Sequence, residues 1–145
     1  MAVAFILFGT LTGTSLMTLF SYFLSRKANR NFREPVLLNQ LLFDLPLFEF
    51  KSKPILPGWI LHYAVGFIFV IGFHFFWKMA SITPSLLSGS ILGLFCGMLG
   101  VAGWHLVFLL HPKPPSIELK EYYIHLIVAH IIFGFGAAAG YKLVS

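Results

Sequence analysis

The sequence predicts an all-α membrane protein, with four transmembrane helices in one domain of residues 1–145. Apolar residues make up 58% of the chain and charged residues only 10%, whereas soluble domains have about 50% and about 25%. Four apolar runs each approach or exceed the ~20 residues that a helix needs to cross a bilayer. Because this chain has too few polar residues to cover a water-soluble core, we expect a lipid bilayer to surround it.

The first apolar run covers residues 2–24 and indicates a retained membrane helix. No basic segment precedes it and no convincing small-residue cleavage site follows it, and it is longer than the apolar part of a signal peptide. Basic residues follow it directly, as expected for the flank of a membrane helix. The other three spans are expected at residues 56–77, 85–110 and 122–143, and none has a charged residue in its middle.

The connector between the first two spans, residues 25–55, is the longest segment that contains polar residues. Within it, residues 35–46 place leucines at helical spacing between Pro35 and Pro46, and these prolines suit the start and the stop of a helix. The segment is too short to span, so we expect a short helix that lies in the membrane interface. A docking site for a partner protein is the alternative, because connectors often carry function.

The basic residues predict an orientation. Of the 10 Lys and Arg residues, only Lys78 and Lys142 lie outside the first and third connectors, residues 25–55 and 111–121. Basic loops stay in the cytoplasm, so we expect these two connectors there, both termini outside, and the chain in a bacterial inner membrane. The formal charge of +5 therefore reports topology, and no nucleic acid partner is expected.

Glycines at spacings of four predict close helix packing, because residues four apart share one helix face. Packing inside one bundle is our preferred interpretation, and a homo-oligomer surface is the alternative. The expected packing positions are Gly9, Gly13, Gly66, Gly72, Gly89, Gly93, Gly97, Gly134, Gly136 and Gly140.

Some of these positions suggest an internal repeat. The spacing of His62, Gly66 and Gly72 recurs, at a constant offset, as His130, Gly134 and Gly140. Gly9 and Gly13 match Gly93 and Gly97 in a similar way. We interpret the chain as two similar helix pairs, related by a pseudo-two-fold axis along the membrane normal. Chance is the alternative, because glycine is frequent in membrane helices.

Histidines within membrane helices are candidate functional residues. His62 and His130 are expected at similar depth near the cytoplasmic face, where they are candidate axial ligands of a b-type haem, and His105 is a substitute ligand. Imidazole also suits a metal ion, but no carboxylate lies within a span, so we expect no metal site. Our preferred interpretation is the simpler one, that these imidazoles only form hydrogen bonds with neighbouring groups, and haem binding is the alternative.

No nucleophile–base–acid set and no phosphate-binding glycine loop is present, so we expect no catalytic activity of the chain's own. Our first hypothesis is an accessory or scaffold subunit that packs with other membrane subunits. The second is a haem-b or quinone-associated electron-transfer subunit, and the third is a small oligomeric channel or carrier.

Overall fold

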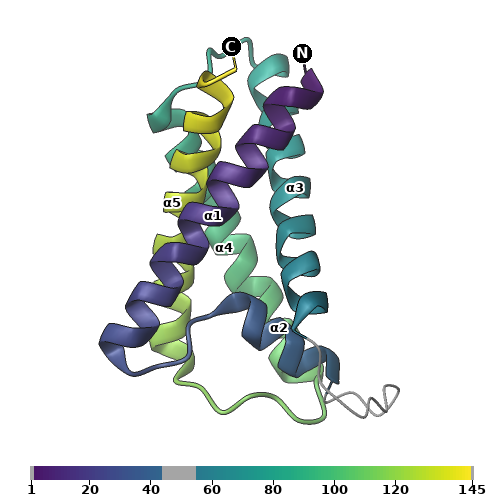
Figure 1. The fold of residues 1–145 in the computed structure, drawn as a ribbon, viewed down its shortest axis with the longest axis vertical. Helices are drawn as coiled ribbons and strands as arrows, with labels where there is room; N and C mark the ends of the chain where they lie inside the picture. Colours follow the sequence, from purple (N-terminus) through teal and green to yellow (C-terminus); the bar gives the residue numbers. More distant parts are fainter. Residues whose placement is uncertain (1, 44–54, 145) are drawn as a thin grey trace.

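The computed structural model describes residues 2–43 and 55–144, and this part of the chain is all-helical (Figure 1). Four helices are long and apolar enough to cross a membrane, which confirms the four predicted spans. Their bounds are α1 Ala2–Ala28, α3 Leu56–Met79, α4 Leu86–Leu110 and α5 Leu119–Lys142.

The expected short helix is also present, as α2, Glu34–Phe43. It begins one residue before Pro35, while residues 44–46 of the expected segment lie outside the described residues. Figure 1 shows both termini at one end of the bundle and α2 at the opposite end, together with the α4–α5 connection. We refer to this second end as the α2 end.

The centre of the bundle is α5, which packs along both α1 and α4. In the most apolar window of α5, 56% of the residues are buried inside the protein, against 22% in α3 and in α4. A central helix must accept close neighbours on several faces, which explains the run of small residues from Gly134 to Gly140. The faces of α3 and α4 that point outward are left for lipid.

Most of the glycines expected to pack lie against another helix. A Cβ added at Gly134 would overlap the Gly89 carbonyl of α4, and one added at Gly13 would lie 2.8 Å from the Phe133 carbonyl of α5. Gly72 is placed differently, because it is exposed on α3 and nothing lies within 4 Å of an added Cβ. The remaining seven face the neighbouring helices α1, α3 or α5: Gly9, Gly66, Gly89, Gly93, Gly97, Gly136 and Gly140.

The two halves of the proposed repeat do not pack alike. α1 and α5 share a long interface, whereas α3 and α4, which a two-fold axis would pair in the same way, touch at few positions. One of these contacts is a hydrogen bond of 3.1 Å from Trp77 Nε1 to Ser88 Oγ, close to the α3–α4 turn. The repeat therefore stays a prediction about the sequence, without support from the packing.

The short helix α2 is folded into the bundle and packs mainly on α3, with Glu34 and Leu37 fully buried. Asn39 ties α2 to the start of α3, because its Oδ1 accepts a hydrogen bond of 2.7 Å from the Gly58 N–H. His111, after α4, donates from Nε2 to the Leu41 carbonyl at 2.9 Å. α2 therefore closes one end of the space between the long helices.

Candidate functional site

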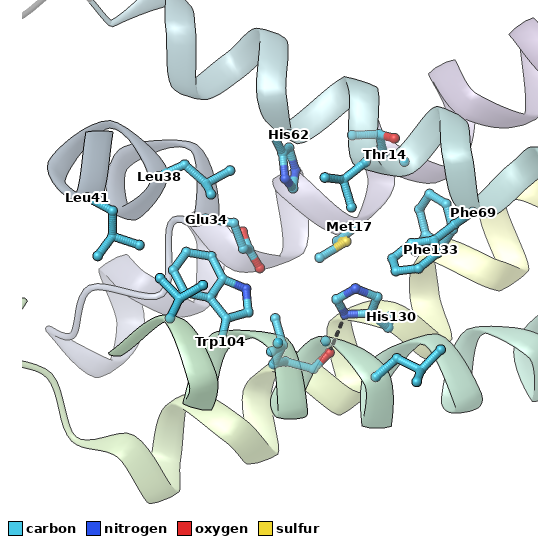
Figure 2. Close-up of a pocket in the computed structure, with 17 residues that line it drawn as sticks. Thr14, Met17, Glu34, Leu38, Leu41, His62, Phe69, Trp104, His130 and Phe133 are labelled. Carbon is cyan, nitrogen blue, oxygen red and sulfur yellow. Dashed lines mark hydrogen bonds between the residues drawn. The ribbon is translucent and has the colours of Figure 1, made fainter. Parts of the chain in front are cut away.

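A cavity of about 290 Å³ lies between the helices, and all five helices contribute to its lining (Figure 2). Three of its lining residues, Val65 on α3 and Leu99 and Val107 on α4, are also exposed on the outside of the protein. Because α3 and α4 scarcely touch, the cavity opens sideways between them, toward the lipid. Its inner lining is mostly apolar and includes the rings of Phe69, Trp104 and Phe133, which Figure 2 labels.

One face of α1 carries buried hydroxyl groups at and behind the lining of this cavity. Thr14 is itself a lining residue, whereas Thr18 and Ser21 are not. Thr14, Thr18 and Ser21 follow helical spacing and are buried. The Thr18 hydroxyl donates to the Thr14 carbonyl at 2.6 Å, and the Ser21 hydroxyl lies 3.0 Å from the Met17 carbonyl. A hydroxyl that donates to its own helix keeps its oxygen free to accept a further hydrogen bond. This face can therefore satisfy polar side chains from other helices.

Glu34 is a buried carboxyl group that enters the cavity from α2. Its side chain is only 2% exposed, and Ser21 Oγ donates to its Oε1 at 2.7 Å. Its other oxygen, Oε2, has no hydrogen-bond partner among the described residues. Burial raises the pKa of Glu34 to about 8, although two hydrogen bonds, from the backbone and from Ser21, oppose this shift. Around pH 7 the carboxyl group is therefore mostly neutral.

The structure brings His62 and His130, two of the three predicted haem ligands, to the same cavity. His62 Nε2 lies 2.9 Å from Thr18 Oγ1. Because the Thr18 hydroxyl gives its hydrogen to the Thr14 carbonyl, His62 Nε2 must be the donor in this bond. His130 donates from Nδ1 to the carbonyl of Leu126, on its own helix, at 2.8 Å.

The third predicted haem ligand, His105, lies apart from the cavity. It is exposed on α4, and its Nδ1 lies 3.1 Å from the hydroxyl of Tyr123. A bis-imidazole haem site needs one free nitrogen from each ring, directed at a shared iron. His62 already uses Nε2 on Thr18, and a Cβ at Gly100 would lie 3.4 Å from His130 Nε2. These contacts give the haem hypothesis no support.

A second histidine of α5, His125, extends the polar group around Glu34. Its Nε2 lies 2.9 Å from Ser21 Oγ, and its ring stacks on Phe32 with 4.8 Å between the ring centroids. A hydrolytic triad would place the acid on the second histidine nitrogen, but His125 Nδ1 has no hydrogen-bond partner within residues 2–43 and 55–144, and Glu34 bonds to Ser21. Since Ser21 is also fully buried, we interpret the cluster as an anchor for Glu34 and not as a nucleophile.

Comparison with known proteins identifies no relative of this chain, since no family model, no curated protein and no solved structure matches it. The fold and the cavity therefore define the class, an integral membrane protein with four helices long and apolar enough to span a bilayer and an internal cavity among them.

Sequence reasoning missed Glu34, because carboxylates were sought only within the spans and Glu34 lies in the connector. It also assigned no partner to the α1 hydroxyls. The available signal was their spacing. Thr14, Thr18, Ser21 and Ser25 lie on one face of an apolar helix, and such a face indicates that polar side chains from elsewhere pack against it.

Proposed function

We propose that this chain is a membrane-embedded subunit that binds a lipid-soluble small molecule in the cavity between α3 and α4. The observation that carries the proposal is an apolar cavity that opens toward lipid and has polar groups at its inner end. Ligand sites are typically concave and mostly apolar, with a few polar groups that fix orientation. A lipid-soluble molecule can enter such a cavity from the bilayer without passing through water.

Of the three functional hypotheses from the sequence, this proposal is closest to the quinone-associated subunit. The aromatic side chains of Phe69, Trp104 and Phe133 in the lining suit a planar ring, since aromatic rings favour stacked or edge-to-face contacts. The lateral opening also suits an accessory role. A partner membrane protein that packs along α3 and α4 would lie next to the bound molecule and could exchange it.

We further propose that the α2 end faces the cytoplasm of a bacterial inner membrane. Most of the basic residues lie in the two connectors at this end, and only Lys78 and Lys142 lie at the other. The polar end of the cavity, with Glu34, would then lie near the cytoplasmic face.

Two glycines provide a matched test of the cavity. No described atom lies within 4 Å of a Cβ added at Gly103 or at Gly72, and both glycines are exposed, but Gly103 also lines the cavity whereas Gly72 lies on the outside of α3. Gly103→Phe should fill part of the cavity, whereas Gly72→Phe should place the same ring in lipid. We expect a lipid-soluble small molecule to co-purify with the native sequence and with Gly72→Phe, and to be largely lost from Gly103→Phe.

The measurement is organic extraction of the protein, purified in mild detergent, followed by mass spectrometry of the extract and normalisation to protein. Extracts of the three proteins with the same composition would contradict the proposal. A loss shared by both variants would also contradict it, because Gly72 does not contact the cavity.

A further inference from the structure

We infer that the molecule held in this cavity carries a carbonyl group on a planar ring, as a quinone does, and that this oxygen accepts a hydrogen bond from Glu34 Oε2. The inference rests on the proposed function and adds to it the chemistry of the ligand's head group and the residue that recognises it.

The first step is the hydrogen bonding of the carboxyl group. Glu34 Oε1 already accepts from Ser21, so in a neutral carboxyl group Oε1 is the carbonyl oxygen and Oε2 carries the proton. Buried donors are nearly always satisfied in folded proteins, and this one has no partner among the described residues. Glu34 lines the cavity, and Figure 2 shows its side chain directed into the space between His62, Met17 and Trp104. A ligand in the cavity can therefore supply the missing acceptor.

The second step is the protonation state, which the neighbouring groups support. His125 Nε2 lies 3.8 Å from Glu34 Oε1, but its ring is stacked against Phe32, an apolar setting that disfavours an imidazolium. The Arg33 guanidinium has other partners, because its Nε bonds to Asn31 Oδ1 at 3.3 Å and its Cζ lies 5.8 Å from the centroid of the Tyr22 ring. Burial of the carboxyl group, with its pKa raised to about 8, therefore leaves a donor at neutral pH.

Other titratable groups surround Glu34 on three more helices. They are Tyr22 on α1, His62 on α3, and Tyr122 and His130 on α5. Tyr122 is fully buried, and among the described residues its hydroxyl bonds to no group, Glu34 Oε2 included. His62 donates to Thr18. The residues of α4 that line the cavity carry no titratable group, and Glu34 therefore remains the carboxyl donor that the cavity offers.

The third step is the body of the ligand. Trp104 lies next to Glu34 in Figure 2, and Phe69 and Phe133 lie farther along the same cavity. These rings offer flat apolar surfaces beside the carboxyl donor of Glu34, and the unpartnered hydroxyl of Thr14 also lines this part of the described structure. A flat ring with a carbonyl oxygen matches both features, whereas a charged head group would be buried among apolar side chains without a counter-ion, which is costly.

Two probes of the same shape test this inference. 2,3-Dimethyl-1,4-naphthoquinone has ring carbonyls and no free ring position for attack by the thiol of Cys96, and 2,3-dimethylnaphthalene lacks the carbonyls. Each is equilibrated with the full chain in lipid nanodiscs, the free probe is measured after ultrafiltration, and binding to empty nanodiscs is subtracted. We expect the native sequence to bind the quinone about tenfold more tightly than the hydrocarbon at pH 7, the effect of one net hydrogen bond.

Substitutions at Glu34 then test whether this residue causes the preference for the quinone over the hydrocarbon. Glu34→Leu removes the donor and should abolish most of the tenfold difference. Glu34→Gln keeps an N–H donor and should retain this difference.

The preference should also depend on pH. With the native sequence, it should be present below the folded-state pKa of Glu34, which is about 8, and should be lost as the pH rises through this value, because the carboxylate has no proton to donate. With Glu34→Gln the preference should not change with pH.

The possible results distinguish a failure of the head-group inference from a failure of the proposed function. An equal affinity for both probes, or a preference that Glu34→Leu leaves intact, overturns the head-group inference, while binding that Gly103→Phe abolishes still supports the cavity. A quinone affinity that increases above pH about 8 also overturns it, because a carboxylate favours a ligand that donates. No saturable binding of either probe overturns both. If Glu34→Leu fails to fold, the pH profiles of the native sequence and Glu34→Gln decide the question.

Discussion

Two hydroxyl groups of α1, those of Thr18 and Ser21, each form more than one hydrogen bond, and the site depends on this. Thr18 donates to its own helix and accepts from His62, while Ser21 contacts Glu34 and His125. In a membrane bundle, water is scarce and an unsatisfied polar group is costly. The hydroxyls therefore allow a neutral imidazole and a neutral carboxyl group to be buried without a counter-ion.

A substitution of Thr18 tests this dependence. Thr18→Val keeps the shape of the side chain but leaves the His62 N–H without an acceptor, which should reduce the free energy of unfolding by roughly 1–3 kcal/mol. The control is Thr10→Val, because the Thr10 hydroxyl is also buried but bonds only to the Ile6 carbonyl of its own helix. The measurement is unfolding in mixed detergent micelles. Equal losses in the two variants would show that His62 does not rely on Thr18.

The sequence predicted some of the site residues and not others, for a physical reason. His62 and His130 were identified because an imidazole in an apolar run is unusual, and both line the cavity. Glu34 was missed because, in the sequence, it adjoins Arg33 and a proline in a basic connector, a setting typical of a solvated loop. Its burial depends on the contact with Ser21, and this contact joins two different helices.

At the scale of the helices, the α4–α5 interface depends on backbone contact. A Cβ at Gly134 would overlap the Gly89 carbonyl, and one at Gly93 would overlap the His130 carbonyl. Close approach of this kind is how helices associate in lipid, where apolar burial gives little drive.

A methyl group added at this interface should be destabilising. We expect Gly134→Ala to reduce the free energy of unfolding by roughly 1–3 kcal/mol, the usual range for overpacking, because the helix backbones must separate. Gly72→Ala is the control, since nothing lies near its added Cβ; it should be neutral or slightly stabilising, because alanine favours the helix more than glycine does. Unfolding in mixed micelles measures both. A neutral Gly134→Ala would indicate that the two helices do not approach as closely as described.

The spans were predictable and the position of α2 was not. The thickness of a bilayer fixes how many apolar residues a span needs, and the ends of α1, α3, α4 and α5 accordingly lie within a few residues of the expected ones. α2 is positioned by Asn39, which bonds to Gly58, and by His111, which bonds to Leu41. These partners are distant in the sequence, and no local pattern indicates them.

At the scale of the whole molecule, the cavity exists because the bundle is asymmetric. α5 contacts α1 and α4 along its length, while α3 contacts mainly α1 and α2. Two equivalent helix pairs would have brought α3 and α4 together as closely as α1 and α5, and would have closed the lateral opening. The cavity that supports our proposal therefore depends on a departure from the symmetry that the sequence spacing suggested.

The remaining question at this scale is which end of the bundle faces the cytoplasm. The fold places the α4–α5 connection at the α2 end and the α3–α4 turn at the other end, with the termini. Lys113 and Thr83 are exposed positions in these two segments. In a Cys96→Ser background, each can be replaced by a single cysteine and labelled with a membrane-impermeant maleimide.

We expect Lys113→Cys to react in inverted membrane vesicles but not in intact spheroplasts, and Thr83→Cys to show the opposite pattern, because basic connectors remain on the cytoplasmic side. Labelling from the same side at both positions would contradict the arrangement of the four helices. A complete reversal would leave the fold intact and show that the basic residues do not set the orientation. The polar end of the cavity, with Glu34, would then lie near the outer face, and the bound molecule's head group would face that side of the membrane.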